Sequence, residues 1–444
     1  MIIDFAIKNF LSFKEEVVFS MLAAKSVKEL EEDGTNHSNI FMLPNTSLRF
    51  VKVATVYGAN GSGKSNLITA MAFFKNMLKN SYSNDNILKG FRQKQFLFDD
   101  EEEKETGFEI NIIVNNSRYR YGFEIKKERI ISEWLFEQRL GNPKERYCFK
   151  RIDNDIKTNS KVFKVSKQII EFTRDNTLFI TTTGLSKVPI AQEIRNWVLN
   201  DFNIINGIDN STINFTAEQY HNNEEMQKRI IDFIQFADFC IKDINVEETL
   251  IEKVSDIKDP MLRKLLGGID NESNQIDKKI KELNIQSFHN QYGDNKVIGK
   301  IPIPFRSESV GTIKAFAMIG PWIDSLMNCK TLVVDEFGAS IHTKLAIELI
   351  RLFQSKLNNG AQLIVSTHDT NLLRKDLLRR DQIWFTEKNE YEVSDLYSLV
   401  EYKINQATSV RNDASFSKDY LNGKYGAIPH FGNIEQFIED YGKE

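Results

Sequence analysis

The sequence predicts an α/β protein with a mixed sheet, an antiparallel β subdomain near the N-terminus and a helical insertion in the middle. An apolar, β-branched run over residues 51–56 leads into a glycine-rich loop and then into a stretch with the apolar spacing of a helix. Further along, two apolar strands at 331–334 and 362–366 are separated by a helical pattern over 344–357. Strands that alternate with helices in this way are typical of parallel β/α units.

Residues 1–140 form the first of three predicted segments. Apolar stretches at 2–7 and 17–19 predict two strands before the glycine-rich loop, and residues 66–80 after the loop predict a helix. Apolar and polar residues alternate over 108–114 and again over 119–125, which predicts an antiparallel hairpin. The acidic run 99–103 has no apolar surroundings and is interpreted as a solvated loop.

The second segment, residues 141–300, is predicted to be a mostly helical insertion. It is long, polar and rich in Asn, Lys, Glu and Ile, with aromatic packing anchors at Trp197, Phe202, Phe233 and Phe236. No apolar heptad persists over many turns, and Gly267 with Gly268 interrupts the best candidate, which argues against a long coiled-coil arm. The third segment, residues 301–444, contains a helix from about residue 311 and the two apolar strands described above.

Composition favours a folded protein without an overall electrostatic preference for nucleic acid or membrane. The chain has 444 residues, 41% of them hydrophobic and 27% charged, with a formal net charge of −4, which is typical of a globular chain of two or three domains. Cys148, Cys240 and Cys329 lack the paired spacing of a zinc site or a disulfide framework. No run approaches the ~20 apolar residues that span a bilayer. We therefore expect a cytoplasmic protein that contacts no membrane, although a local basic face is compatible with nucleic acid.

Residues 58–65, with the sequence GANGSGKS, match a phosphate-binding loop between a strand and a helix. Glycines in such a loop take positive φ so that backbone amides surround a phosphate, and the N-terminus of the following helix adds roughly half a positive charge. Lys64 is expected to reach the β- and γ-phosphates of ATP, and Ser65 to ligate Mg²⁺. The predicted nucleotide-binding residues are Gly58, Asn60, Gly61, Ser62, Gly63, Lys64, Ser65 and Asn66.

Two carboxylates, Asp335 and Glu336, follow the apolar strand 331–334, at the end of the sheet where nucleotides bind in open α/β proteins. Asp335 is predicted to hold Mg²⁺ together with Ser65, and Glu336 to act as the base for an attacking water. His368 follows the strand 362–366 and is placed to contact the γ-phosphate. These residues predict an ATPase that converts ATP and water to ADP and phosphate, with catalytic roles for Glu336, His368 and Lys64.

A turn of small residues, 307–312, lies one helix before the acidic strand. Its hydroxyls and backbone amides stand at a predicted helix start, where a γ-phosphate binds favourably. The succession of phosphate loop, small-residue turn, acidic pair and histidine separates one class of phosphate-loop ATPase from the others.

With these motifs in this order, the chain resembles ABC-type ATPases of the chromosome-maintenance and RecF branch. It is more closely similar to AAA-family ATPases of bacterial phage-defence operons, related to the ATPase part of OLD proteins and to the ATPase subunits of PARIS and Septu systems. The resemblance covers about residues 1–140 and 300–444. It includes the stretch 7–13, DEFGASIH at 335–342, RRDQIWF at 379–385 and YLNGKYGAIP at 420–429.

The resemblance implies an ABC-type ATPase head in which two modules face each other and hold ATP between the phosphate loop of one and the turn 307–312 of the other. Ser309 and Gly311 would bind nucleotide in trans. Ser340, also expected to bind nucleotide, and His342 would lie on a loop that crosses the dimer interface. His368 would be the switch histidine.

This chain departs from the family pattern at two points. Val310 replaces the first glycine of the usual serine-glycine-glycine signature, and Gln93 and Gln95 are the candidates for the glutamine that normally follows an early strand. The segment after His368 is too short for the nuclease domain of OLD proteins.

The resemblance also implies a homodimer or higher homo-oligomer that acts as the sensor of an antiviral defence system. Such a protein controls a separate, nuclease-like effector encoded nearby.

Two alternative functions stay open at this point. One is a DNA-repair module that resembles RecF and clamps DNA. Its only local support is a cluster of basic residues that we interpret more simply as a solvated helix face, made of Arg374, Lys375, Arg379 and Arg380. The other is a small-molecule nucleotide kinase, against which the turn 307–312 argues.

Overall fold

The computed structural model describes residues 1–28, 37–99, 104–207, 210–237, 239–253, 275–339, 341–404, 408–409 and 415–429. The chain forms two compact units, the first of residues Met1–Gly207 with Ser325–Glu444 and the second of Ile208–Asp324. Within the described ranges, no helix combines the length and the apolar character needed to cross a membrane.

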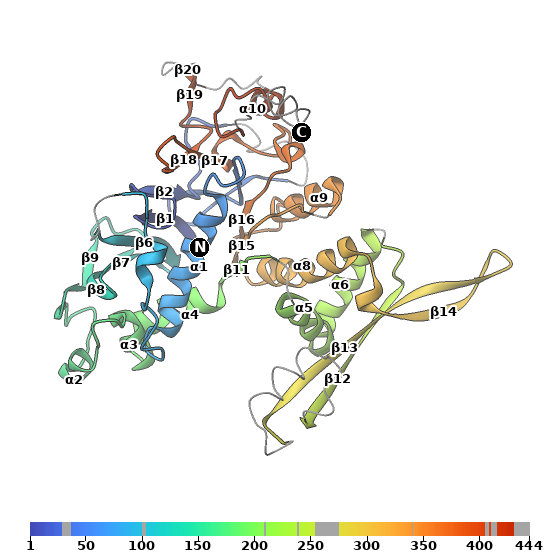
Figure 1. The fold of residues 1–444 in the computed structure, drawn as a ribbon, viewed down its shortest axis with the longest axis horizontal. Helices are drawn as coiled ribbons and strands as arrows, with labels where there is room; N and C mark the ends of the chain where they lie inside the picture. The colour runs from blue at the N-terminus through green and yellow to red at the C-terminus, as the bar shows by residue number, and fades with distance from the viewer. Residues whose placement is uncertain are drawn as a thin grey trace, which may run out of the picture. The chain divides into compact units, whose positions relative to one another are not determined.

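The first unit contains a six-stranded sheet with the order β11-β15-β16-β5-β17-β18 (Figure 1). Five of its strands run parallel, namely β11 (Phe202–Ile205), β15 (Thr331–Val334), β16 (Gln362–Ser366), β5 (Val53–Tyr57) and β17 (Ile383–Lys388). The edge strand β18 (Ser394–Ser398) is antiparallel to β17. All residues of β5, β15 and β16 are buried, which explains why these strands read as continuous apolar runs.

A second sheet of the first unit is antiparallel and has seven strands. Its order is β10 (Asp155–Thr158), β9 (Arg146–Ile152), β8 (Arg129–Arg139), β7 (Ser117–Lys126), β6 (Thr106–Val114), β1 (Ile2–Lys8) and β2 (Val17–Ser20). The hairpin predicted over 108–125 is the pair β6 and β7. The described part of this unit also contains two short ribbons, β3 (Ile40–Met42) with β4 (Arg49–Val51), and β19 (Lys403–Ile404) with β20 (Thr408–Ser409).

Helix α1 (Lys64–Asn80) follows the phosphate loop and contacts the antiparallel sheet. Its Phe74 ring stacks on Phe123 of β7 at 5.6 Å between centroids and meets Phe5 of β1 edge-on at 5.7 Å. Burial of such rings and their mutual contacts stabilise the core. The other helices here are α2 (Lys167–Glu171), α3 (Phe179–Leu185), α4 (Pro189–Asn200), α9 (Thr343–Phe353) and α10 (Phe416–Leu421), with short 3₁₀ turns at Phe91–Lys94, Thr370–Leu372 and Arg380–Gln382.

The second unit combines helices with a three-stranded antiparallel sheet. The helices are α5 (Asn210–Asn222), α6 (Glu224–Phe236) and most of α8 (Val310–Met327), after a 3₁₀ turn at Phe305–Ser307. The sheet has the order β12 (Asp243–Lys253), β13 (Gln275–Gly293) and β14 (Lys296–Pro304). Figure 1 shows β13 and β14 as a long ribbon.

The prediction of a mostly helical segment over 141–300 is wrong in two respects. Its first part adds β9 and β10 to the antiparallel sheet and β11 to the parallel one, and its last part contains β12 to β14. β14 is exposed to solvent along most of its length. A strand that is exposed on both faces lacks the alternation of apolar and polar residues by which a half-buried strand is recognised in a sequence. Gly267 and Gly268 lie outside the described residues. The predicted α/β fold class, with its mixed sheet and antiparallel β subdomain, is confirmed.

Candidate nucleotide-binding site

Three parallel strands of the first unit end at the same edge of the sheet. Val56 of β5 pairs with Ser366 of β16, and Val365 of β16 pairs with Val334 of β15. The segments that follow these strands are the phosphate loop, the Thr367–His368 turn and the Asp335–Glu336 pair. Because the strands are in register, the fold brings together the motifs that the sequence places far apart.

The phosphate loop takes the conformation that its glycines were predicted to permit. Gly61 has a φ of 76° and Gly63 a φ of 119°, in the region that side chains with a Cβ rarely adopt. A Cβ on Gly63 would lie 2.7 Å from Ser394 Oγ, whereas one on Gly61 would meet nothing within 4 Å. Gly63 is therefore fixed by close packing, and Gly61 lies on the open side of the loop.

Three residues that belong to no sequence motif form hydrogen bonds with the phosphate loop or with the first turn of α1. Thr386 Oγ1 of β17 lies 2.6 Å from Ser62 Oγ, and Ser394 Oγ of β18 donates to the Ser62 carbonyl at 2.7 Å. Ser12 Oγ accepts a hydrogen bond from Asn66 Nδ2 at 2.7 Å. Ser12, Thr386 and Ser394 could not be identified from the sequence, because an isolated hydroxyl residue has no motif that distinguishes it from an ordinary surface position.

Lys64 is buried at the first position of α1, and its ammonium donates to the carbonyls of Gly58 and Ala59, both at 2.9 Å. Burial lowers the pKa of Lys64 to about 8, while the negative charges of Asp335 and Glu336 oppose that shift. The lysine is thus electrostatically coupled to both carboxylates. The neighbouring Ser65 is exposed.

Asp335 and Glu336 have different environments. Ser366 Oγ donates to Asp335 Oδ1, and the Glu336 amide donates to the same carboxylate oxygen at 3.1 Å and to Ser366 Oγ at 2.9 Å. These bonds fix the Asp335 carboxylate. Glu336 has a positive φ of 52° and an exposed side chain, so its backbone is held in an uncommon conformation while its carboxylate faces solvent.

Replacing Ser366 by alanine is expected to lower the rate of ATP hydrolysis about tenfold, because the loss of a hydrogen bond that orients a charged group costs about 1.5 kcal/mol. ATP hydrolysis by Ser366→Ala should be measured over a range of Mg²⁺ concentrations. Ser398→Ala is the matched control, since Ser398 is a buried serine of the same sheet that bonds only to backbone groups. Equal rates in the two variants would contradict the orienting role.

His368 lies close enough to Lys64, Asp335 and Glu336 for their charges to affect its pKa. Partial burial and the nearby charge of Lys64 lower the pKa of His368, and the charges of Glu336 and Asp335 oppose the shift. A lowered pKa keeps the imidazole neutral at pH 7. The next residue, Asp369, accepts a hydrogen bond from Thr343 Oγ1 at 2.8 Å, which connects this turn to the start of α9.

Of the two residues predicted on the interface loop, the structure describes His342 alone. His342 is the N-cap of α9, and its Nδ1 accepts a hydrogen bond from the Lys344 amide at 3.1 Å. Ser340 lies outside the described residues. Of the two glutamine candidates, Gln95 is buried and donates to the Lys104 carbonyl at 2.9 Å, whereas Gln93 is exposed.

The small-residue turn belongs to the second unit, where Ser309 precedes α8. Ser309 Oγ accepts a hydrogen bond from the Thr312 amide at 3.1 Å, the pattern of a helix N-cap. Gly311 lies in the first turn of the helix. Glu308 accepts hydrogen bonds from Ser287 and from His289, both of β13, which attach the turn to the three-stranded sheet.

The basic cluster is not the solvated helix face that the sequence predicted. Arg379 is fully buried and pairs with Asp381, with Nη2 of the arginine 2.7 Å from Oδ2 of the aspartate. Arg380 is also buried, and Arg374 pairs with Asp376 at 2.6 Å. These residues stand in turns and a 3₁₀ segment. With two of its four members buried, the cluster gives little support to a DNA clamp.

Comparison with solved structures finds similarity to heads of SMC proteins. An SMC head bound to the C-winged helix domain of ScpA shares 14% identity, with coverage of 92% of this chain and 99% of that chain and a TM-score of 0.45. The SMC head domain from Thermotoga maritima shares 13% identity, with coverages of 89% and 98% and a TM-score of 0.39. No curated protein matches the chain.

A family model described as "AAA domain, putative AbiEii toxin, Type IV TA system" matches residues 53–374. The match begins at the first residue of β5 and extends past β16, so it contains the phosphate loop, the acidic pair and His368. It spans well over half of the 444 residues. The chain therefore belongs to this AAA-domain family, AAA_21.

Proposed function

We propose that the chain binds Mg-ATP at residues 58–65 and hydrolyses it. The observation that carries this proposal is the convergence of Lys64, Asp335, Glu336 and His368 on the edge where β5, β15 and β16 end. The residues fit a nucleotide phosphate, because the loop combines an open glycine with a buried ammonium and the start of a 17-residue helix.

In this proposal each side chain has a separate task. Lys64 donates to the β- and γ-phosphates, and Ser65 and Asp335 hold Mg²⁺. When bound, Mg²⁺ neutralises phosphate charge and orients the γ-phosphate. Glu336, whose carboxylate is exposed, accepts a proton from water, and the neutral His368 forms a hydrogen bond at the γ-phosphate.

We further propose that ATP closes two copies of the chain around two nucleotides, with Ser309 and Gly311 completing the site in trans. About 5 kcal/mol of differential binding moves such an equilibrium from mostly open to mostly closed. The switch would serve a cytoplasmic antiviral defence system of the PARIS or Septu kind, in which this chain senses infection and restrains or activates a separate nuclease-like effector. The family resemblance and the ordered motifs support this proposal.

The experiment is native mass spectrometry of Glu336→Gln, co-expressed with the product of the neighbouring gene. With Mg-ATP we expect a dimer or a multiple of it that carries the neighbour, and without nucleotide a smaller species. Ser309→Arg is a matched variant, because its bulky cation should abolish the ATP-dependent dimer but leave ATP bound. A monomer that does not respond to ATP would contradict the sandwich.

A further inference from the structure

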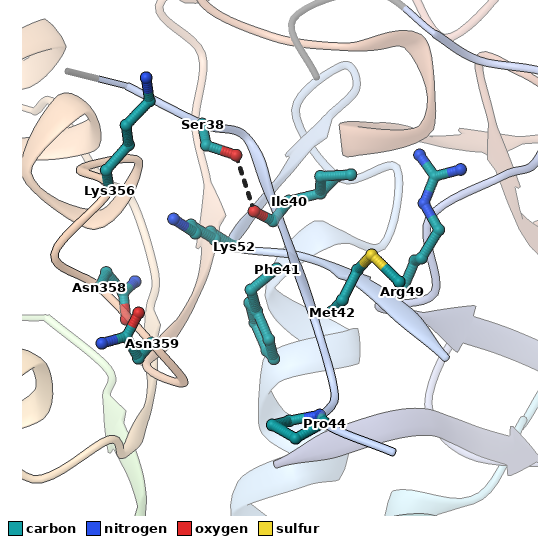
Figure 2. Close-up of a pocket in the computed structure, with 10 residues that line it drawn as sticks. All are labelled: Ser38, Ile40, Phe41, Met42, Pro44, Arg49, Lys52, Lys356, Asn358 and Asn359. Atoms are coloured by element: carbon teal, nitrogen blue, oxygen red, sulfur yellow. Dashed lines mark hydrogen bonds between the residues drawn. The ribbon is translucent and has the colours of Figure 1, made fainter. Parts of the chain in front are cut away.

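A pocket of about 900 Å³ lies in the first unit, away from the phosphate loop (Figure 2). One side is formed by the β3–β4 ribbon and the loop between its strands, and the other by the turn that leads from α9 into β16. Its volume is within the range of sites that hold small organic ligands. No role is assigned to this pocket by the ATPase proposal.

The pocket and the phosphate loop lie at opposite ends of β5. Lys52, which lines the pocket, directly precedes β5, whereas Gly58 directly follows it. A strand of five residues spans about 16 Å at its usual rise per residue. A ligand in the pocket would therefore occupy a second site and would not be part of the nucleotide site.

Lys52 is a buried cation with few interactions. Its side chain is almost fully buried, and its ammonium donates to one group, the Ser355 carbonyl, at 2.8 Å. An ammonium has three protons to donate. Burial lowers the pKa of Lys52 to about 8, and no carboxylate of the described chain pairs with it. Retaining an unpaired buried charge costs free energy, unless a bound anion compensates it.

The rest of the pocket matches an anion that also carries an apolar part. Figure 2 shows the Lys52 side chain directed toward the turn of Lys356 and Asn359, with Arg49 on the other side of the pocket. The Phe41 ring supplies an apolar surface, whereas the side chain of Met42, the next residue of β3, points to the opposite face of the ribbon. The Phe41 ring is held by stacking on Phe50, with 5.4 Å between ring centroids. The pocket thus combines a buried ammonium with a fixed aromatic surface.

We propose that this pocket binds a small phosphorylated ligand of nucleotide size, with its phosphate at Lys52 and its apolar or aromatic part against Phe41. The ligand's charge would compensate the buried ammonium, and Lys356 and Arg49 would add long-range attraction. This inference does not depend on the ATPase proposal, because it concerns other residues at the other end of the strand.

Isothermal titration of the full chain with inorganic pyrophosphate and with AMP tests the proposal. The background is Lys64→Met, which removes the main cation of the phosphate loop. Adding Lys52→Met should lower the affinity for both probes at least about tenfold, and adding Lys356→Ala about threefold. Adding Lys75→Met is the matched control and should change neither, since Lys75 is another partly buried lysine that donates to a carbonyl, that of Phe202 at 2.6 Å.

A melting temperature separates loss of the ligand site from loss of the fold. Methionine at position 52 replaces an unpaired charge, so Lys52→Met should melt at or above the temperature of the parent but lose the stabilisation that AMP confers. Binding that is absent at millimolar concentrations of both probes, or that survives Lys52→Met, would overturn the proposal. Inorganic phosphate, titrated in the same way, tests the apolar surface: AMP that binds no more tightly than inorganic phosphate would overturn the role of Phe41.

Discussion

Replacing Glu336 by glutamine is expected to slow ATP hydrolysis by about 10²–10⁴-fold, the usual contribution of a positioned general base. Glutamine keeps the size and hydrogen-bonding capacity of the side chain but cannot take a proton from water. The backbone around residue 336 should be unaffected, because it is held through its amide by Asp335 and Ser366 and not through the side chain. ATP should therefore stay bound while turnover almost stops.

Single-turnover hydrolysis and equilibrium ATP binding, measured on the same preparation, separate chemistry from affinity. The matched control is Glu348→Gln on α9, since Glu348 forms a partly exposed pair with Arg351 that contributes little to stability. The control should retain the parent rate. If Glu336→Gln hydrolysed ATP as fast as Glu348→Gln, the base would have to be another residue.

The parallel strands and the motifs after them could be predicted because their physics is local. Strands β15 and β16 are buried along their whole length, so their apolar runs give their boundaries without ambiguity. The phosphate loop needs glycine at 61 and 63 for its positive φ values and lysine at the helix start. Because these residues are nearly consecutive, the motif can be recognised from the sequence alone. Proximity of the loops then follows from the parallel arrangement.

Features that depend on distant contacts could not be predicted. Thr386 and Ser394 support the loop from strands more than 300 positions away in the sequence, and nothing near either residue indicates this role. Arg379 was interpreted as a surface charge, yet it is buried because Asp381 lies within reach of its guanidinium. In both cases tertiary packing determines the environment of the side chain, and this packing cannot be inferred from the neighbouring residues of a single sequence.

Replacing Lys64 by methionine is expected to weaken ATP binding by roughly 10²–10³-fold, since charge-assisted bonds to two phosphates contribute about 3–4 kcal/mol together. The ammonium is held at the mouth of the loop by the carbonyls of Gly58 and Ala59. With a pKa lowered by burial to about 8, it is still mainly protonated at pH 7 and can exchange these carbonyls for phosphate oxygens.

The control for this prediction is a lysine of the same helix in a similar physical state. Lys75 is partly buried, donates to the Phe202 carbonyl at 2.6 Å and also has a pKa lowered by burial to about 8. Lys75→Met should therefore lose a similar amount of stability to Lys64→Met but bind ATP as the parent does. Calorimetric titration of both variants with ATP and Mg²⁺ decides the point. A comparable loss of affinity in the two would mean that disturbance of α1, and not a direct contact of Lys64 with phosphate, accounts for the effect.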